Sequence, residues 1–231
     1  MKMAVFDLLK SAKIGCHIYK MFLAIILFAD DICLLAPTRS ALQRLVTLCA
    51  DFFRELGLEF NPKKCKIMVF HSKHLDTSVY QPIRINNSNV AYVDSTTYLG
   101  MKIVSNQGFT FSANDDLMSF YRAFNAVYST RGKPSDEILM QLLYTNCVPI
   151  LTYGNGVKEY PSRQMNDCNT AVNNAIRRIF TYHRWESVRS LREELGYKSL
   201  TELFATSKDN FTSSLSNHRN PIIRELSTLP L

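Results

Sequence analysis

Apolar residues near the start of the chain form two short runs, and two adjacent acids separate them. The first run covers residues 21–28, and the second begins at residue 32, directly after Asp30 and Asp31. This pattern predicts two buried strands joined by a tight acidic turn. Buried carboxylates need a neutralising cation, and Mg²⁺ is typically held by one or two carboxylates together with substrate phosphates. A solvated β-turn is the alternative, because Asp is a common turn residue.

A helical pattern follows at residues 40–56, where apolar residues recur at spacings of three and four. Thr38 or Ser40 is placed to cap the start of this helix, and Gly57 is placed to end it. The apolar positions are Leu42, Leu45, Val46, Cys49, Phe52, Phe53 and Leu56.

Short elements surround this helix on both sides. Residues 4–12 are predicted as the end of a helix that Gly15 breaks, and residues 16–36 as two or three strands. After the helix we expect a turn at 61–64, strands at 65–70, 83–86, 92–93 and 98–104, a polar loop at 71–79 and a turn at Asn86 and Asn87.

The pattern becomes helical from about residue 112. Helices are predicted at about 112–130, 135–148, 165–180, 187–195 and 199–213, and the tail after Asn217 is expected to be loosely held. A soft boundary is expected at residues 105–114. The sequence therefore predicts an α+β fold with one domain at 1–110 and a helical part at 111–231.

The amino-acid composition restricts the possible class of protein only a little. The 231 residues are 46% hydrophobic and 20% charged, which is typical of a globular protein with a real core. The net charge of +7 fits a polyanionic partner or simply keeps the protein soluble.

The six cysteines contain no C-x-x-C pair, so neither a zinc site nor a disulfide framework is expected, and a reducing, intracellular location in cytoplasm or nucleus is favoured. Cys33, Cys49, Cys147 and Cys168 are interpreted as small core residues. No apolar run approaches the ~20 residues of a membrane-spanning helix, so no membrane association is expected. The five histidines show no metal-binding spacing.

Three blocks occur in an order that is typical of one family. They are Phe28-Ala-Asp-Asp, then Leu-Gly-Leu-Glu-Phe-Asn-Pro-Lys-Lys-Cys at 56–65, then Tyr98-Leu-Gly. Residues 15–18, 34–37 and 173–180 add further matches. Together they resemble the C-terminal palm and thumb portion of the reverse transcriptase of non-LTR, LINE-like retrotransposons, over roughly residues 5–200. The fold implied is a truncated polymerase palm, an antiparallel sheet with packed helices, followed by an α-helical thumb and a C-terminal extension.

The resemblance assigns the metal site to the acidic turn. Asp30 and Asp31 would be the catalytic and metal-binding residues, with Asp30 on Mg²⁺ and Asp31 at the rim. The family's other metal-binding Asp, its fingers and its nucleotide-selecting block would precede this chain. Phe28 replaces the more usual Tyr, and we expect it to pack in the sheet.

Further residues are assigned by the same resemblance. Lys64 would bind the incoming nucleotide, whereas Lys63 and Lys66 are equally well explained as solvated. Tyr98, Leu99 and Gly100 would form the primer grip, and an ordinary strand followed by a Gly turn is the alternative.

A basic stretch lies in the expected thumb. Arg177, Arg178, Arg184, Arg189 and Arg192 fall within sixteen residues and would bind nucleic acid. Tyr182, His183 and Trp185 lie between them and could stack on bases or pack on sugars. A charged helix face with Trp185 in a small core explains the pattern equally well.

The function implied is that of a fragment of an RNA-directed DNA polymerase. Its partners would be an RNA template, a DNA primer and dNTPs. Because the upstream Asp is missing, we expect this chain to be inactive alone. A non-catalytic nucleic-acid-binding module and a non-functional remnant that folds poorly are the alternatives.

Overall fold

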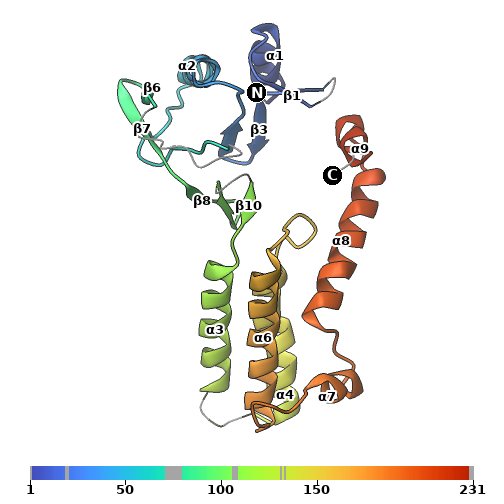
Figure 1. Cartoon of the computed structure of the whole chain (residues 1–231). Helices are drawn as coiled ribbons and strands as arrows, with labels where there is room; N and C mark the ends of the chain where they lie inside the picture. The colour runs from blue at the N-terminus through green and yellow to red at the C-terminus, as the bar shows by residue number, and fades with distance from the viewer. Residues whose placement is uncertain are drawn as a thin grey trace. The chain divides into compact units, whose positions relative to one another are not determined.

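A computed structural model describes residues 2–18, 21–70, 80–105, 109–130, 132 and 134–228 (Figure 1). The chain divides into two compact units. The first is Met1–Thr96 with Ser105–Gln107, and the second is Thr97–Val104 with Gly108–Leu231. The predicted loop at 71–79 and residues 106–108 of the predicted boundary lie outside the described residues.

The first unit begins with one helix and two hairpins. They are α1 (Lys2–Ser11), β1 (Cys16–Ile18), β2 (Met21–Leu23), β3 (Ile25–Phe28) and β4 (Asp31–Leu34). Residues 16–36 therefore contain four short strands, where we expected two or three. β1 pairs with β2 and β3 with β4, both antiparallel.

Helix α2 (Arg39–Glu55) matches its prediction at both ends. Thr38 is the N-cap, and its hydroxyl accepts a hydrogen bond from the Ala41 N–H at 3.2 Å. At the other end Gly57 has φ +74, and the Leu58 N–H donates to the Phe53 carbonyl, which is a Schellman ending.

Neighbouring faces of α2 belong to two hydrophobic cores. Leu45, Cys49 and Phe53 pack with Val5 and Leu9 of α1 and with Ile25. Val46 packs with the strands that follow, in a cluster with Ile67, Ile83, Ile85 and Val90.

Those strands form a three-stranded sheet. They are β5 (Lys66–Ile67), β6 (Ile83–Ile85) and β7 (Ser88–Tyr92), in the order β5-β7-β6. β5 pairs parallel with β7 and is shorter than the predicted 65–70 strand. The predicted turn at Asn86 and Asn87 is confirmed, because both residues have positive φ, as a type I′ turn requires.

One side chain of α2 protects the outer edge of this sheet. The Gln43 amide accepts from the Arg84 N–H at 2.8 Å and donates to the Arg84 carbonyl at 2.9 Å. These hydrogen bonds satisfy backbone groups of β6 that could otherwise pair with the edge of another strand.

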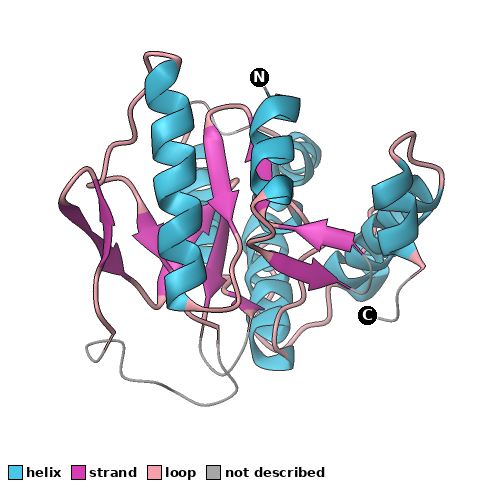
Figure 2. Cartoon of the chain, turned by 90° about the horizontal axis from the view of Figure 1, so that it is seen from above, coloured by secondary structure: helices cyan, strands magenta, loops and turns pink. Residues whose placement is uncertain are grey.

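The second unit combines one small sheet with helices. Figure 2 colours the helices and strands of the chain by type. Its strands β8 (Ser95–Tyr98), β9 (Met101–Val104) and β10 (Thr110–Phe111) lie in the order β10-β9-β8. The helices are α3 (Asn114–Tyr128), α4 (Asp136–Leu142), α5 (Val148–Thr152), α6 (Ser162–Ile179), α7 (Arg189–Glu194), α8 (Leu200–Ser216) and α9 (Pro221–Ser227). Phe120, Leu139, Met140, Leu143 and Ile176 are among its fully buried residues.

A π-helical segment, η2 (Leu143–Cys147), joins α4 to α5. Pro149 stands in the first turn of α5. In an uninterrupted α-helix its ring would clash with the carbonyl four residues earlier, at Thr145. The wider π turn thus lets the predicted 135–148 helix continue past a residue that would break it.

The structure confirms a mixture of helices and small sheets, compatible with α+β, and corrects two details. The expected antiparallel sheet is four small sheets, one of which contains the parallel β5–β7 pair. The tail after Asn217 is not simply loose, because α9 lies within it and contacts α8.

Candidate functional site

The two adjacent acids lie at the tip of the β3–β4 hairpin. Phe28 pairs with Asp31, so Ala29 and Asp30 form the connection. Ala29 has φ +48, a conformation that residues other than Gly rarely adopt. Strained backbone of this kind persists only where its surroundings impose it, and it is concentrated at functional sites.

The hairpin has one core face and one open face. Ile25 and Leu27 of β3 pack in the first core, together with Ile32 and Leu34 of β4. Directly paired residues share a face, so Asp31 lies on the open face with Phe28.

Exposure of this tip corrects two expectations. Asp30 and Asp31 are exposed rather than buried between strands. Phe28 does not pack in the sheet, because 60% of its surface is open. The turn itself was predicted correctly. The predicted burial of its residues was wrong, because the tip of the hairpin is exposed.

Two carboxylates from one turn suit a hard cation by chemistry, since Mg²⁺ prefers oxygen ligands. They do not complete a metal centre here. No group of three or more His, Cys, Asp or Glu side chains with metal-site geometry occurs in the part of the chain that the structure describes. The residues therefore fit part of a magnesium site.

Lys64 lies on the turn between α2 and β5, where it was predicted. Its N–H donates to the Asn61 carbonyl at 3.0 Å, and the Lys63 N–H donates to the Asn61 side chain at 3.1 Å. The side chains of Lys63, Lys64 and Lys66 are all exposed. A role in nucleotide binding stays a prediction.

The Tyr98-Leu99-Gly100 block forms the connection between β8 and β9. Leu99 has φ +47 and Gly100 has φ +76, so both residues of this two-residue turn are left-handed. Leucine is strained in that conformation, whereas glycine is not.

Tyr153, just after α5, holds this turn in the second unit. Its hydroxyl donates to the Leu99 carbonyl at 3.1 Å. A Cβ added to Gly100 would lie 3.1 Å from the Tyr153 ring. Glycine at position 100 thus satisfies both the backbone conformation and the close approach of the ring.

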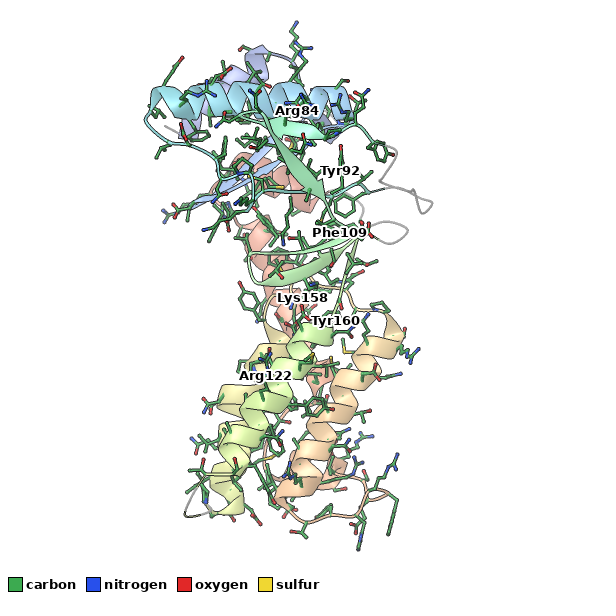
Figure 3. All side chains as sticks on the ribbon, turned by 90° about the vertical axis from the view of Figure 1, so that its left-hand side faces the viewer. Arg84, Tyr92, Phe109, Arg122, Lys158 and Tyr160 are labelled. Carbon is green, nitrogen blue, oxygen red and sulfur yellow. The ribbon has the colours of Figure 1, made fainter. Side chains whose placement is uncertain are left out.

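A buried ion pair near the start of α3 was not predicted. Lys158, only 4% exposed, donates to the Asp116 carboxylate at 2.7 Å, and the Tyr160 hydroxyl donates to the same oxygen at 2.8 Å (Figure 3). Burial, together with this hydrogen bond to the carboxylate, raises the pKa of Tyr160. Because the partners are 42 and 44 residues apart, no local pattern could have indicated the cluster.

Asn155 lies in the same loop as Lys158, between α5 and α6, and is 2% exposed. Neither its amide nitrogen nor its amide oxygen has a hydrogen-bond partner among the residues with described positions.

The five arginines predicted to bind nucleic acid differ in how many contacts their guanidinium groups make with other residues. Arg178 donates to the Asn125 side chain at 2.9 Å, and its guanidinium lies 4.4 Å from the Tyr128 ring centroid. Arg189 pairs with Glu193 at 2.8 Å.

Arg177 and Arg192 are partly enclosed. Arg177 donates to the Glu186 carbonyl at 3.0 Å and to the Asn174 side chain at 3.0 Å. The Nε of Arg192 is buried without a hydrogen-bond partner in the described structure. Arg184 is exposed, and no hydrogen bond or ion pair joins its guanidinium to another described residue.

The aromatic residues beside Arg184 face water. Trp185 is 81% exposed, which excludes the alternative that it occupies a small core. Its ring stacks on His183 with centroids 4.7 Å apart and planes 4° apart.

The cysteines offer no reactive thiol. All six are free, and burial raises the pKa of the Cys49 and Cys168 thiols to about 11. Both thiols are therefore protonated at neutral pH, which excludes them as thiolate nucleophiles. Within the described ranges, no helix has the length and apolar character needed to cross a membrane.

Comparison with known proteins identifies the class. Residues 5–103 match the family model described as reverse transcriptase (RNA-dependent DNA polymerase). This range contains the β3–β4 hairpin, the Lys64 turn and the Tyr98-Leu99-Gly100 connection. This part of the chain is therefore similar to reverse transcriptases.

A curated relative narrows the kind of element. The chain is 30% identical over 83 residues to the "Retrovirus-related Pol polyprotein from type-1 retrotransposable element R2" of Nasonia vitripennis. The match covers 33% of this chain and 8% of that polyprotein, so the chain corresponds to a small part of the relative. Over part of its length the chain is therefore similar to the reverse transcriptase family and to a retrotransposon polyprotein.

Proposed function

We propose that the chain is the palm and thumb portion of a retrotransposon RNA-directed DNA polymerase and that it binds an RNA template and a DNA primer. The observation that carries this proposal is the acidic hairpin: two adjacent, exposed carboxylates at a strained two-strand tip, inside the range that matches the reverse transcriptase family. Primer, template and dNTP are partners of the family and are proposed here for this chain.

The proposal assigns metal chemistry to Asp30 and Asp31. Asp30 and Asp31 would hold Mg²⁺, which would supply activation of the primer 3′-oxygen and neutralisation of the leaving pyrophosphate. The two acids of this chain would form one side of that metal site. Since no third acid joins them among the described residues, we propose that the isolated chain transfers no nucleotide.

The second unit would bind the primer and template backbone. Support comes from the turn at Leu99 and Gly100, which Tyr153 holds, and from the exposed Arg184 in the loop after α6. Exposed arginines contribute affinity by neutralising phosphates, and that contribution falls with rising salt.

The test is primer extension on poly(rA) annealed to oligo(dT), with Mg²⁺ or Mn²⁺, combined with fluorescence anisotropy of the same labelled substrate. We expect salt-sensitive binding and no incorporation above the Asp30→Ala background. Asp51→Ala is the matched control, because Asp51 is an exposed acid on α2.

Each outcome has a distinct meaning. Incorporation that Asp30→Ala abolishes and Asp51→Ala preserves would overturn the proposed inactivity and would establish the metal role. Absence of binding at low salt by a cooperatively folded chain would overturn the proposed nucleic-acid function.

A further inference from the structure

The loop between α6 and α7 presents two flat rings to solvent. Trp185 is the most exposed large hydrophobic residue in the described chain at 81%, followed by Met118 at 62%. An indole in water is unfavourable, and burying its face would release that cost. The parallel stack with His183 leaves the outer face of the indole open.

Several hydrogen bonds hold this loop in one conformation. The Tyr182 N–H donates to the Arg177 carbonyl at 2.9 Å, which closes the end of α6. The Arg177 guanidinium holds the Glu186 carbonyl at 3.0 Å. The Glu186 carboxylate in turn accepts from the His183 N–H.

The next residues anchor the loop to the core of the second unit. Val188 is buried in that core, two residues after Glu186. The two rings are therefore displayed on a fixed backbone, which lowers the entropy lost when a ligand binds.

The charge of the loop favours an anionic ligand. Arg184 stands between the two stacked residues in sequence, and its guanidinium makes no hydrogen bond or ion pair within the described structure. Glu186 is the only acid in the segment from 177 to 192, and the His183 backbone uses its carboxylate.

We propose that His183, Arg184 and Trp185 form a stacking site for an unpaired nucleotide, with its base on the Trp185 ring and its phosphate on Arg184. Aromatic faces combined with a free cation are the usual means of binding single-stranded nucleic acid. The base must be unpaired, because neighbouring base pairs cover both faces of a base inside a duplex. This inference rests on the proposed nucleic-acid function and adds a single-strand site to it.

The chain provides its own probe, because Trp185 is its one tryptophan. Titration with unlabelled single-stranded oligo(dT) and with an oligoribonucleotide of equal length should quench its fluorescence. A blunt-ended duplex should quench much less. An abasic oligonucleotide of equal length, which has the phosphates but not the bases, should leave the fluorescence nearly unchanged.

Variants give a second measurement. Trp185→Ala should weaken binding of a labelled single strand roughly fivefold to a hundredfold, the range found for loss of one stacked base, and should leave duplex affinity nearly unchanged. Trp185→Phe should retain most of the affinity. Tyr121→Ala is the control, because Tyr121 is an exposed aromatic residue on α3 outside the loop.

The outcomes separate this inference from the proposed function. Anisotropy that shows binding while Trp185 fluorescence stays constant would overturn the stacking site and leave the proposed function intact. Equal quenching by the abasic strand would also overturn it. Fluorescence that changes with protein concentration alone would assign the rings to self-association and would overturn it as well.

Discussion

Thr181 is the most strained single residue beside the exposed loop. It follows the end of α6 with φ +60, where a β-branched residue is a rare outlier. Glycine is the usual residue at this position of a helix ending. The loop that displays His183 and Trp185 therefore holds its shape at some expense of stability.

Replacing Thr181 by Gly should relieve that strain. Left-handed backbone costs an L-residue roughly 1–2 kcal/mol, and the extra unfolded-state entropy of Gly offsets part of the gain. We expect the free energy of unfolding to rise by up to about 1 kcal/mol, measured by urea denaturation.

Ser129→Gly is the matched control, because Ser129 ends α3 with φ −90. Glycine offers no conformational relief there, so stability should fall. A stabilising effect at both positions would contradict the strain argument.

The buried Lys158–Asp116 pair should respond very differently to the loss of one partner and of both. Lys158→Ala leaves a largely buried carboxylate without its cation and should lower the free energy of unfolding by about 3 kcal/mol. The double replacement Lys158→Met with Asp116→Leu should recover part of this loss, because apolar residues can substitute for a buried pair, whereas the Tyr160 hydroxyl loses its acceptor.

Denaturant midpoints measure both effects. Arg189→Ala is the comparison, since it breaks an exposed pair with Glu193 and should change the midpoint little. Equal losses for the single and double variants would contradict the argument.

Ionisation of Tyr144 should lower the folding stability of the second unit at alkaline pH. Burial raises the pKa of its hydroxyl to about 12, while the hydroxyl donates to the Lys198 carbonyl at 2.9 Å. A pKa above the unfolded value means that the stabilising contribution is complete below about pH 10 and is lost as the pH rises towards 12.

Urea denaturation at a series of pH values tests this. Tyr144→Phe removes the titrating hydroxyl, so its stability should fall less steeply than that of the parent chain between these pH values. Identical slopes for the two proteins would show that other groups cause the alkaline loss.

At the scale of the elements, the β8–β9 turn depends on a contact from a distant loop. Tyr153→Phe keeps the ring over Gly100 but removes the hydroxyl that binds the Leu99 carbonyl. With the loss of one hydrogen bond, worth about 1 kcal/mol, hydrogen exchange of the amides at 98–101 should become roughly fivefold faster.

The β6–β7 turn at Asn86 and Asn87 is the internal reference for this measurement. It has the same left-handed conformation but belongs to the other unit. Its exchange should therefore be unchanged. Faster exchange at both turns would indicate general destabilisation rather than loss of one contact.

The elements also show which features could be predicted from sequence. Helix α2 was predicted with its cap at Thr38 or Ser40 and its end at Gly57, because capping and amphipathic spacing are local, and the structure selects Thr38. The exposure of Phe28 and the length of β5 were predicted wrongly. Both depend on which strands lie alongside, and local alternation does not carry that information.

The same distinction applies to the candidate site. The acidic turn was located by a short motif. The predicted strand at 98–104 was wrong, because the turn at Leu99 and Gly100 separates β8 from β9. The Lys158 cluster and the hold of Tyr153 on Leu99 were missed because their partners are more than 40 residues apart. Stacking of Tyr182, His183 and Trp185 on bases was one of two interpretations of this segment. The exposure of Trp185 excludes the other, in which it occupies a small core.

At the scale of the whole molecule, the net charge of +7 makes electrostatics part of any interaction with nucleic acid. The arginines do not contribute equally to phosphate binding. Arg178 already contacts Asn125 and Tyr128, whereas the Arg184 guanidinium makes no hydrogen bond or ion pair with another described residue. Net charge therefore overstates the number of phosphates that the protein can neutralise.

Salt dependence of single-strand binding distinguishes these two arginines. Log affinity falls as log salt rises, and each phosphate contact steepens that fall. The contribution per contact is about 0.9 for duplex DNA and about 0.7 for single strands. Arg184→Ala should reduce the slope by roughly that amount and leave the free energy of unfolding unchanged. Arg178→Ala should leave the slope nearly constant and lower stability, because it removes the contacts to Asn125 and Tyr128. Equal slope changes for the two variants would mean that binding senses the charge of the whole protein rather than a defined site at Arg184.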